Sequence, residues 1–442
     1  MKKIAFILLT ILPILVTSQE EKKFGIQFSG FVKTDIFYDT RQTVDLREGH
    51  FLILPANEKL DTYGNDINAH SSFNFLSIQT RLNGNITGPD VLKAKTSGYI
   101  EAEFFGTSNA DVNGFRLRHA YAMLDWKKSE LMIGQFWHPM FITSCFPATL
   151  SFNTGAPFEP FSRNPQIRYT FRFGKFRAIG TAVAQRDFQN QGPNGASTEY
   201  LRNAGIPEGN LKLEFNSVNK EKEQEFLFGL GADYKMLQPR LFTTVAWKVN
   251  DTVFTINPAD TLIVPLEKKR DYETNVTVDG LSAFAYFKLK FKPITIKVQG
   301  TYGQLTDNLT MLGGYAVSEV TNAATNEVAY TPMSIFSVWT DIHNNGAKWE
   351  YGIFGGYTQN LGFDLNPVGD PAKNIYGRGS DIKSVYRIAP RVAYKSGKMK
   401  FALEIENTVA AYGKIDQNDK GLVKTTRDIS NLRVLLGVFY MF

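Results

Sequence analysis

The side chains best suited to catalysis are few and scattered in this sequence. One cysteine, Cys145, has no second cysteine for a disulfide or a thiolate metal site. The five histidines are His50, His70, His119, His138 and His343. None has a serine, a carboxylate or a second histidine at a spacing typical of a catalytic or metal site. The pattern predicts neither an enzyme nor a bound cofactor or metal.

Charged side chains recur at alternate positions of short segments, where a β-strand would place them on one face. Cations outnumber acids in this set, and arginine offers forked donors that match a carboxylate or a phosphate. We expect a net basic, pore-lining wall that favours anions; alternatively, each arginine pairs with a nearby acid and only braces the wall. The basic members are Lys33, Arg81, Arg116, Arg118, Arg168, Arg172, Arg387, Arg391 and Arg433, and the acidic members are Glu101, Glu103, Glu404 and Glu406.

The segments that carry these charges alternate apolar and polar residues, as in Phe24 to Tyr38, Asn164 to Gly174 and Ile382 to Lys395. This period of two is typical of strands with one apolar and one polar face. About 16 such segments predict an all-β fold, a transmembrane antiparallel up-and-down β-barrel with an aqueous lumen. The predicted strands begin near Phe24, Ser71, Val91, Gly114, Ser129, Asn164, Lys175, Glu223, Arg240, Leu281, Ile294, Met333, Ala347, Ile382, Lys398 and Asp428.

The predicted connections form two interleaved sets, one short and one long. Barrels of the bacterial outer membrane have short turns at one end and long loops at the other, so this segregation favours such a barrel. Short examples are Lys127-Lys128, Met236 to Pro239 and Ser396-Gly397. The long set is Asp39 to His70, Gly106 to Asn113, His138 to Arg163, Phe188 to Lys222, Asn250 to Gly280, Leu305 to Pro332, Asn360 to Asp381 and Tyr412 to Arg427.

The two ends of the chain indicate export. Residues 1–18 read as a signal peptide, with two lysines before an apolar run, and residues 19–442 as a single barrel domain. Cleavage would remove Lys2 and Lys3 and lower the formal charge from +6 to +4, so a nucleic-acid partner is not expected. The last strand ends in Phe442, an aromatic terminus that resembles the signal read by outer-membrane assembly machinery. We expect the outer membrane of a Gram-negative bacterium, in contact with its lipid and lipopolysaccharide.

The third long loop, His138 to Arg163, is unusually aromatic for an exposed connection. We expect it to fold into the lumen and constrict it, anchored by its phenylalanines; alternatively, it covers a neighbouring subunit. The constriction residues are Phe141, Phe146, Phe152, Phe158, Glu159, Phe161 and Arg163.

A block within Gly114 to Phe141 carries a family resemblance, in the stretches RLRHAY and GQFW. It is similar to the strand-turn-strand block of the general trimeric porins, nearest the DcaP-like branch and the porin O/P group. The resemblance implies a homotrimer that passes dicarboxylates and related organic anions, with Arg116 and Arg118 lining the lumen. Members of the DcaP-like branch often begin with a helical coiled-coil segment, whereas here only Gln19 to Lys23 precede the first expected strand.

The sequence therefore predicts a porin for passive diffusion of small hydrophilic solutes, with a preference for anions such as organic acids or phosphate. The alternative is a barrel whose loops close the pore and which serves as a surface interaction platform.

Overall fold

A computed structural model describes residues 24–254 and 261–442, so the predicted signal peptide lies outside the described residues. One antiparallel sheet of 19 strands closes on itself through the pairing of β1 with β25. β4 and β5 share one position in the wall, and β19 and β22 pair at its rim, which leaves a closed barrel of 16 strands. The prediction of a closed 16-stranded antiparallel barrel is confirmed.

Most strands of the described residues belong to the wall of the barrel, and the other strands and the short helices lie in its loops. The wall strands are β1 (Gly25–Asp39), β4 (Ser72–Leu76), β5 (Arg81–Thr87), β6 (Lys95–Glu103), β7 (Arg116–Trp126), β8 (Ser129–Trp137), β9 (Arg163–Phe173), β10 (Phe176–Val183), β13 (Glu208–Asn219), β14 (Gln224–Leu237), β17 (Val278–Lys290), β18 (Ile294–Gln304), β20 (Glu327–Asn344), β21 (Trp349–Phe363), β23 (Ile382–Ser396), β24 (Met399–Asp416) and β25 (Leu422–Met441). The remaining elements are β2 (Thr43–Leu46), β3 (Phe51–Pro55), β11 (Gln191–Gly192), β12 (Gly195–Ala196), β15 (Phe242–Phe254), β16 (Thr261–Glu273), β19 (Gly313–Asn322), β22 (Ile375–Arg378), α1 (Glu199–Asn203), α2 (Pro371–Asn374) and the 3₁₀-helix η1 (Thr306–Leu309). None of the helices in these residues is long and apolar enough to span a bilayer.

Alternation along each strand gives the wall two different surfaces. In β1, Val32 and Tyr38 are exposed on the outside, whereas Lys33, Asp35 and Asp39 are buried on the inside. Closure satisfies the backbone hydrogen bonds of the wall strands, which is what a strand-built membrane span requires. The apolar residues therefore face lipid and the polar residues face the lumen.

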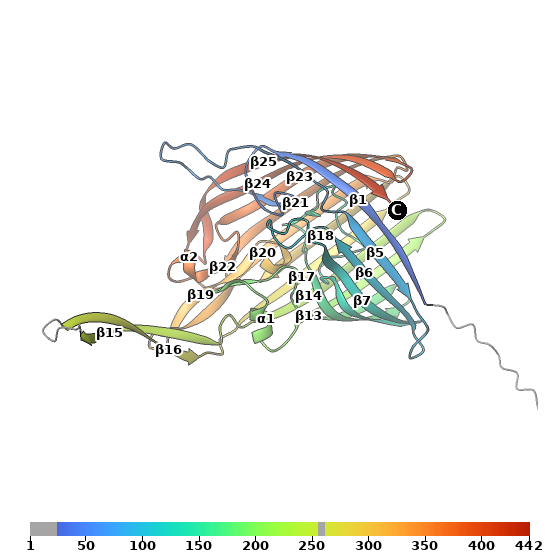
Figure 1. Cartoon of the computed structure of the whole chain (residues 1–442). Helices are drawn as coiled ribbons and strands as arrows, with labels where there is room; N and C mark the ends of the chain where they lie inside the picture. The colour runs from blue at the N-terminus through green and yellow to red at the C-terminus, as the bar shows by residue number, and fades with distance from the viewer. Residues whose placement is uncertain (1–23, 255–260) are drawn as a thin grey trace, which may run out of the picture.

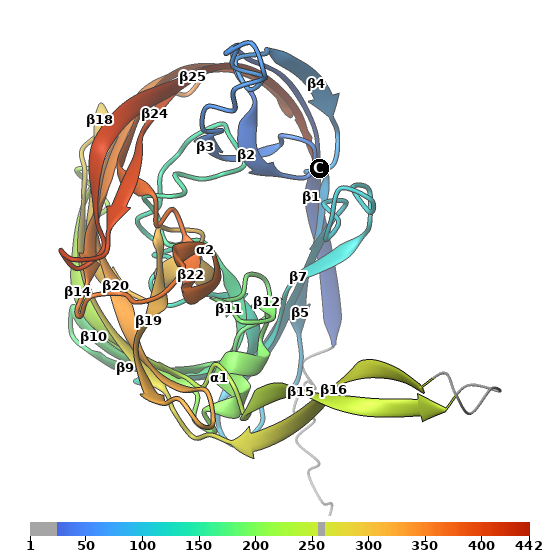
Figure 2. The same cartoon turned by 90° about the vertical axis from the view of Figure 1, so that its left-hand side faces the viewer.

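Short turns and long loops lie at opposite ends of the barrel. The chain enters β1 and leaves β25 at the same end, on the right of Figure 1, where the short turns 127–128, 174–175 and 397–398 also lie. The hairpin β2–β3 belongs to the first long loop, and Figure 2 shows it within the outline of the barrel. Its residues Phe51 to Leu54 are almost completely buried, so this loop fills part of the interior.

Two strand assignments from the sequence are wrong, and they cancel in the count. The strand predicted near Arg240 is β15, which pairs with β16 in a separate hairpin outside the wall. Conversely, the predicted loop Phe188 to Lys222 contains the wall strand β13. Accordingly, Met236 to Pro239 opens a long loop instead of forming a short turn. Alternation indicates that a strand has two unlike faces, but it does not indicate which strands pair with it. The prediction therefore placed β15 in the wall and left β13 in a loop.

The last long loop is also shorter than predicted. β24 runs on to Asp416 and β25 begins at Leu422, so most of Tyr412 to Arg427 is strand. The prediction ended the strands where the sequence becomes polar. Two adjacent strands can, however, continue their hydrogen-bonded pairing beyond the membrane, where their residues are polar on both faces.

Candidate functional site

The loop between β8 and β9, residues 138–162, crosses to strands that are distant in the sequence. Its backbone amides at Leu150 and Ser151 donate to the Glu404 carboxylate on β24, at 2.8 and 2.9 Å. The side-chain amide of Asn153 donates to Glu406 on the same strand at 3.2 Å. Glu404 and Glu406 are both buried, so these carboxylates hold the middle of the loop against β24.

A second set of contacts ties the loop to β20 and β23. The Arg387 guanidinium donates to Ala156 O at 2.6 Å and pairs with Glu406 at 3.1 Å. The Ser337 hydroxyl donates to Phe158 O at 2.9 Å. These contacts place the loop against the inner face of the wall, on the side opposite its own attachment to β8.

Glu159 is fully buried in this loop and accepts a hydrogen bond from the Trp339 indole. Burial raises the pKa of Glu159 well above its ordinary value, and the Trp339 hydrogen bond only partly offsets that effect. The Ile142 backbone amide and the Lys297 charge oppose the effect of burial in the same direction as Trp339, without outweighing it. Burial in this loop therefore favours the neutral form of Glu159 over the charged one.

Aromatic rings anchor the loop at its start. Trp137 and Phe141 stack with their ring centroids 4.0 Å apart, and Phe152 stacks on Phe105 at 4.1 Å. Phe161 meets Trp137 edge-on at 4.9 Å. Phe158 is also buried, whereas Phe146 is partly exposed. Phe141, Phe152 and Phe161 therefore pack in one cluster with Phe146 at its margin, whereas Phe158 packs in a separate cluster against Phe354.

Glu103 on β6 organises a group of arginines. It lies within ion-pair distance of four guanidinium groups, those of Arg81 (2.9 Å), Arg116 (3.3 Å), Arg163 (3.5 Å) and Arg118. Glu101 pairs with Arg118 and lies 3.6 Å from Arg81. We call these six residues the Glu103 arginine group. It brings together five residues singled out as pore-lining and Arg163 from the predicted constriction loop.

Asp187, from the loop after β10, joins this group and was missed by the sequence analysis. It pairs with Arg116 at 3.0 Å and with Arg163 at 2.7 Å. Burial favours the neutral form of Asp187, but the guanidinium groups of Arg163 and Arg116 outweigh it and lower its pKa. No sequence pattern could have found Asp187, since it lies in an irregular loop and its partners come from other elements.

Most of the remaining pore-lining cations also have acidic partners. Lys33 pairs with Asp35 at 3.0 Å, Arg391 with Asp341 at 2.7 Å, and Arg433 with Asp39 at 2.7 Å. Arg172 pairs with Asp125 at 2.7 Å and with Glu130. The set of acids named from the sequence did not include Asp35, Asp39 and Asp341, which are buried on the same inner face. The contacts of these cations agree with the alternative in which each cation pairs with a nearby acid and stabilises the wall.

Arg168 differs from the other arginines on the wall. Its guanidinium donates to Trp137 O at 3.0 Å and lies 5.4 Å from the Phe136 ring centroid. No acid within 4.0 Å pairs with it among the described residues. Its positive charge is therefore the least compensated of the predicted set.

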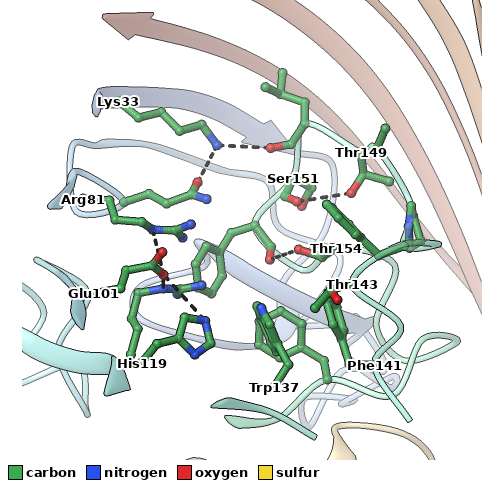
Figure 3. Close-up of a pocket in the computed structure, with 18 of the residues that line it drawn as sticks. Lys33, Arg81, Glu101, His119, Trp137, Phe141, Thr143, Thr149, Ser151 and Thr154 are labelled. Atoms are coloured by element: carbon green, nitrogen blue, oxygen red, sulfur yellow. Dashed lines mark hydrogen bonds and ion pairs between the residues drawn. The ribbon is translucent and has the colours of Figure 1, made fainter. Parts of the chain in front are cut away.

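Two cavities lie on either side of the Glu103 arginine group. The turn-side cavity, about 600 Å³, is shown in Figure 3; Lys33, Arg81, Arg118 and Lys400 line it together with Glu101 and Glu350. The loop-side cavity, about 610 Å³, is lined by Arg47, Arg116, Arg186 and Arg378 with Asp187 as the acid. In both cavities cations outnumber acids.

One buried cluster has the residue types of a metal site. Ligand atoms of His138, Glu208 and Asp233 lie within 4.8 Å of one another. However, His138 Nδ1 accepts from the Met140 backbone amide, so Nε2 carries the proton donated to Glu208 at 2.9 Å. Lys235 Nζ also lies 3.3 Å from Glu208. The contacts therefore favour a structural tie between the loop and strands β13 and β14.

Comparison with known proteins is informative at the level of fold. No family model and no curated protein matches this sequence. Among solved structures, the outer membrane channel DcaP of Acinetobacter baumannii is 15% identical with a TM-score of 0.63, covering 95% of this chain and 97% of that one. The anion-selective porin of Comamonas acidovorans is 11% identical with a TM-score of 0.51, covering 95% and 100%. OmpT of Vibrio cholerae, in its trimer form, is 10% identical with a TM-score of 0.50, covering 95% and 99%.

The fold is thus a closed 16-stranded antiparallel barrel, and it is similar over nearly its whole length to the barrels of these outer-membrane channels. The resemblance noted in the sequence between Gly114 and Phe141 pointed to the same structural group.

Proposed function

We propose that this protein is an outer-membrane porin through which small hydrophilic solutes diffuse passively, with a preference for anions such as organic acids or phosphate. The observation that carries the proposal is the pair of cavities flanking the Glu103 arginine group. Four cations face two acids in the turn-side cavity, and four face one acid in the loop-side cavity. One excess sign of charge on low-dielectric walls raises the local concentration of the opposite ion.

Ion pairing within the wall does not remove this excess. The Glu103 arginine group with Asp187 holds four arginines and three acids, so one positive charge remains. Each guanidinium also has five donors, and a carboxylate rarely uses all of them. The arginines thus offer hydrogen bonds to a passing carboxylate or phosphate while staying fixed by their partners.

The loop 138–162 is proposed as the constriction of the pore. Its contacts with β20, β23 and β24 support this role, because they hold it across the interior between its own attachment and the far wall. The loop also contributes to the lining of the turn-side cavity, where Figure 3 shows Phe141, Thr143, Thr149, Ser151 and Thr154.

Conductance in a planar bilayer tests the function. The refolded or native protein is expected to give stepwise conductance, and a KCl gradient is expected to give a reversal potential of the sign for anion preference. Cation preference would reject the basic wall. A protein that inserts but passes no ions would instead support the second candidate, a surface platform, which is favoured by the packing of β2–β3 and the loop 138–162 inside the barrel.

The assembly and export of the protein complete the proposal. We propose a homotrimer, by analogy with the trimeric OmpT structure, and folding by the outer-membrane assembly machinery through the strand that ends at Phe442. Removal of residues 1–18 as a signal peptide is tested by the mass of the mature chain from the membrane fraction.

A further inference from the structure

The hairpin of β15 and β16 is not needed to build the barrel. The two strands pair only with each other in a sheet of their own, which leaves the long-loop end and extends beyond the outline of the barrel (Figures 1 and 2). Near its base, the Asn326 side chain donates to Thr244 O at 2.9 Å. A two-stranded hairpin is marginally stable in water unless a face is covered. The hairpin is therefore stabilised if one of its faces is covered.

One face combines apolar residues with cations. In the register of the hairpin, Val245 is opposite Arg270, Trp247 opposite Lys268, and Val249 opposite Leu266. Side chains of directly opposed residues share a face. We call these six residues the apolar-cationic face. In the stretches Thr243 to Val249 and Leu266 to Tyr272 no acid lies on this face.

The opposite face is polar and its charges are mutually compensated. Within the same two stretches it carries the opposed pairs Thr244–Asp271, Ala246–Lys269 and Lys248–Glu267. The Thr244 hydroxyl donates to Asp271 at 2.7 Å, and Lys269 lies 4.0 Å from Glu267. A face with this composition is suited to water. Over these two stretches the hairpin is thus amphipathic, with two cations and no acid on its apolar face and two cations against two acids on its polar face.

We propose that the apolar-cationic face docks on the phosphate groups of lipopolysaccharide beside the barrel. Tryptophan partitions to the interface between lipid and water, and Trp247 is 38% exposed. Lys268 and Arg270 supply the charge that anionic headgroups attract. The Arg270 guanidinium lies 5.7 Å from the Trp247 ring centroid, so the aromatic and cationic parts act as one patch.

The hairpin also extends beyond the wall of its own barrel. Because it leaves the long-loop end and passes beyond the wall, it lies over the area that the surrounding lipid occupies (Figure 2). In the outer membrane that lipid carries phosphate on its outer surface. This inference rests on the proposed outer-membrane location, but it is independent of which solute passes through the pore.

A charge reversal on each face provides a matched pair of variants. The full chain in lipid nanodiscs is assayed for binding to purified lipopolysaccharide by surface plasmon resonance. Lys268→Glu with Arg270→Glu is expected to weaken binding at least tenfold, and Trp247→Ser about threefold. The control pair, Lys248→Glu with Lys269→Glu, makes the same net charge change on the polar face and is expected to stay within twofold.

Binding to three other ligands shows whether the phosphate groups of the lipid are what the hairpin recognises. Dephosphorylated lipopolysaccharide and phosphatidylcholine vesicles are expected to bind at least tenfold more weakly than intact lipopolysaccharide, and inorganic phosphate to compete only at millimolar concentrations. Equal loss in both variant pairs, or equal binding of the dephosphorylated lipid, overturns the inference. Bilayer conductance of the same variants should match the wild type, which shows that the barrel is folded and separates this outcome from a failure of the porin proposal.

Discussion

Glu103 shows how a single buried acid can arrange a cationic surface. It is completely buried among four arginines, and two of these line the turn-side cavity while Arg116 lines the loop-side cavity. Without a shared anion, guanidinium groups at this separation would repel one another and swing apart. The acid thus makes a dense row of donors possible on the wall.

Replacing Glu103 by glutamine should therefore be costly. Removing one partner of a buried ion pair leaves uncompensated charge, and a loss of about 3–5 kcal/mol in the free energy of unfolding is expected. Urea unfolding followed by tryptophan fluorescence measures it. Glu130→Gln is the control, because its partner Arg172 is about one-third exposed and loses little. A Glu103→Gln variant as stable as this control would contradict the role assigned to Glu103.

Glu159 is expected to make the protein's stability depend on pH. Its pKa is raised by burial, so the folded state holds a proton that the unfolded state releases. Stability is greatest below the unfolded pKa of about 4.3 and falls as the pH rises from there toward the folded pKa. The midpoint of thermal unfolding should thus fall more steeply between pH 5 and 8 in the wild type than in Glu159→Gln.

The exposed Glu267 provides the reference for that measurement. Glu267→Gln removes a carboxylate that is more than half exposed, and it is measured in the same way as a control for the loss of one surface acid. An identical slope in the wild type and Glu159→Gln would show that Glu159 does not titrate in this way.

At the scale of elements, the loop 138–162 is held by few but strong contacts. Glu404 accepts from two consecutive backbone amides, an arrangement that only a carboxylate can satisfy fully. Glutamine would turn a donor toward at least one of these amides.

Glu404→Gln is accordingly expected to loosen the loop. Losing about 1.5–3 kcal/mol of charged hydrogen bonding should raise the population of a displaced loop roughly tenfold or more. Single-channel recording should then show larger current noise and a higher mean conductance. Glu350 also lines the turn-side cavity but pairs with Lys395 and not with the loop backbone. Glu350→Gln should therefore leave the current noise at the wild-type level. Equal noise in both variants would argue against the anchor.

The hairpin β15–β16 illustrates what an element can do without joining the sheet. Its alternation of residues matches that of a wall strand, yet its apolar face includes two cations that a lipid-buried strand would avoid. Lys268 and Arg270 both lie on β16, so they show their effect on this face only once β15 and β16 are known to pair.

At the scale of the whole molecule, selectivity depends on the summed charge of the lumen. Lys400→Glu changes the turn-side cavity from four cations and two acids to three of each. The anion-to-cation permeability ratio from the reversal potential is expected to fall at least twofold. Lys398→Glu, at the exposed turn before β24, makes the same charge change outside the cavity and should leave the ratio nearly unchanged. Equal shifts would mean that overall charge, and not the cavity, sets selectivity.

Local patterns in the sequence were enough for the architecture. Alternation at every second residue and the contrast between short and long connections predicted a closed barrel, because both follow from the pleat of a strand and the thickness of a membrane. Parity also placed Lys33, Arg387 and Arg433 on the buried face, and would have found Lys400, which shares the parity of Glu404.

Partners that meet through space could not be read in this way. Asp187 reaches Arg116 and Arg163 from an irregular loop, and Glu404 meets Leu150 across the barrel. The same limit exchanged β13 and β15, since each is amphipathic and only pairing distinguishes them. Residue order encodes which face of a strand is polar, whereas closure of the wall and the path of the loops inside it determine which charges come within reach of one another.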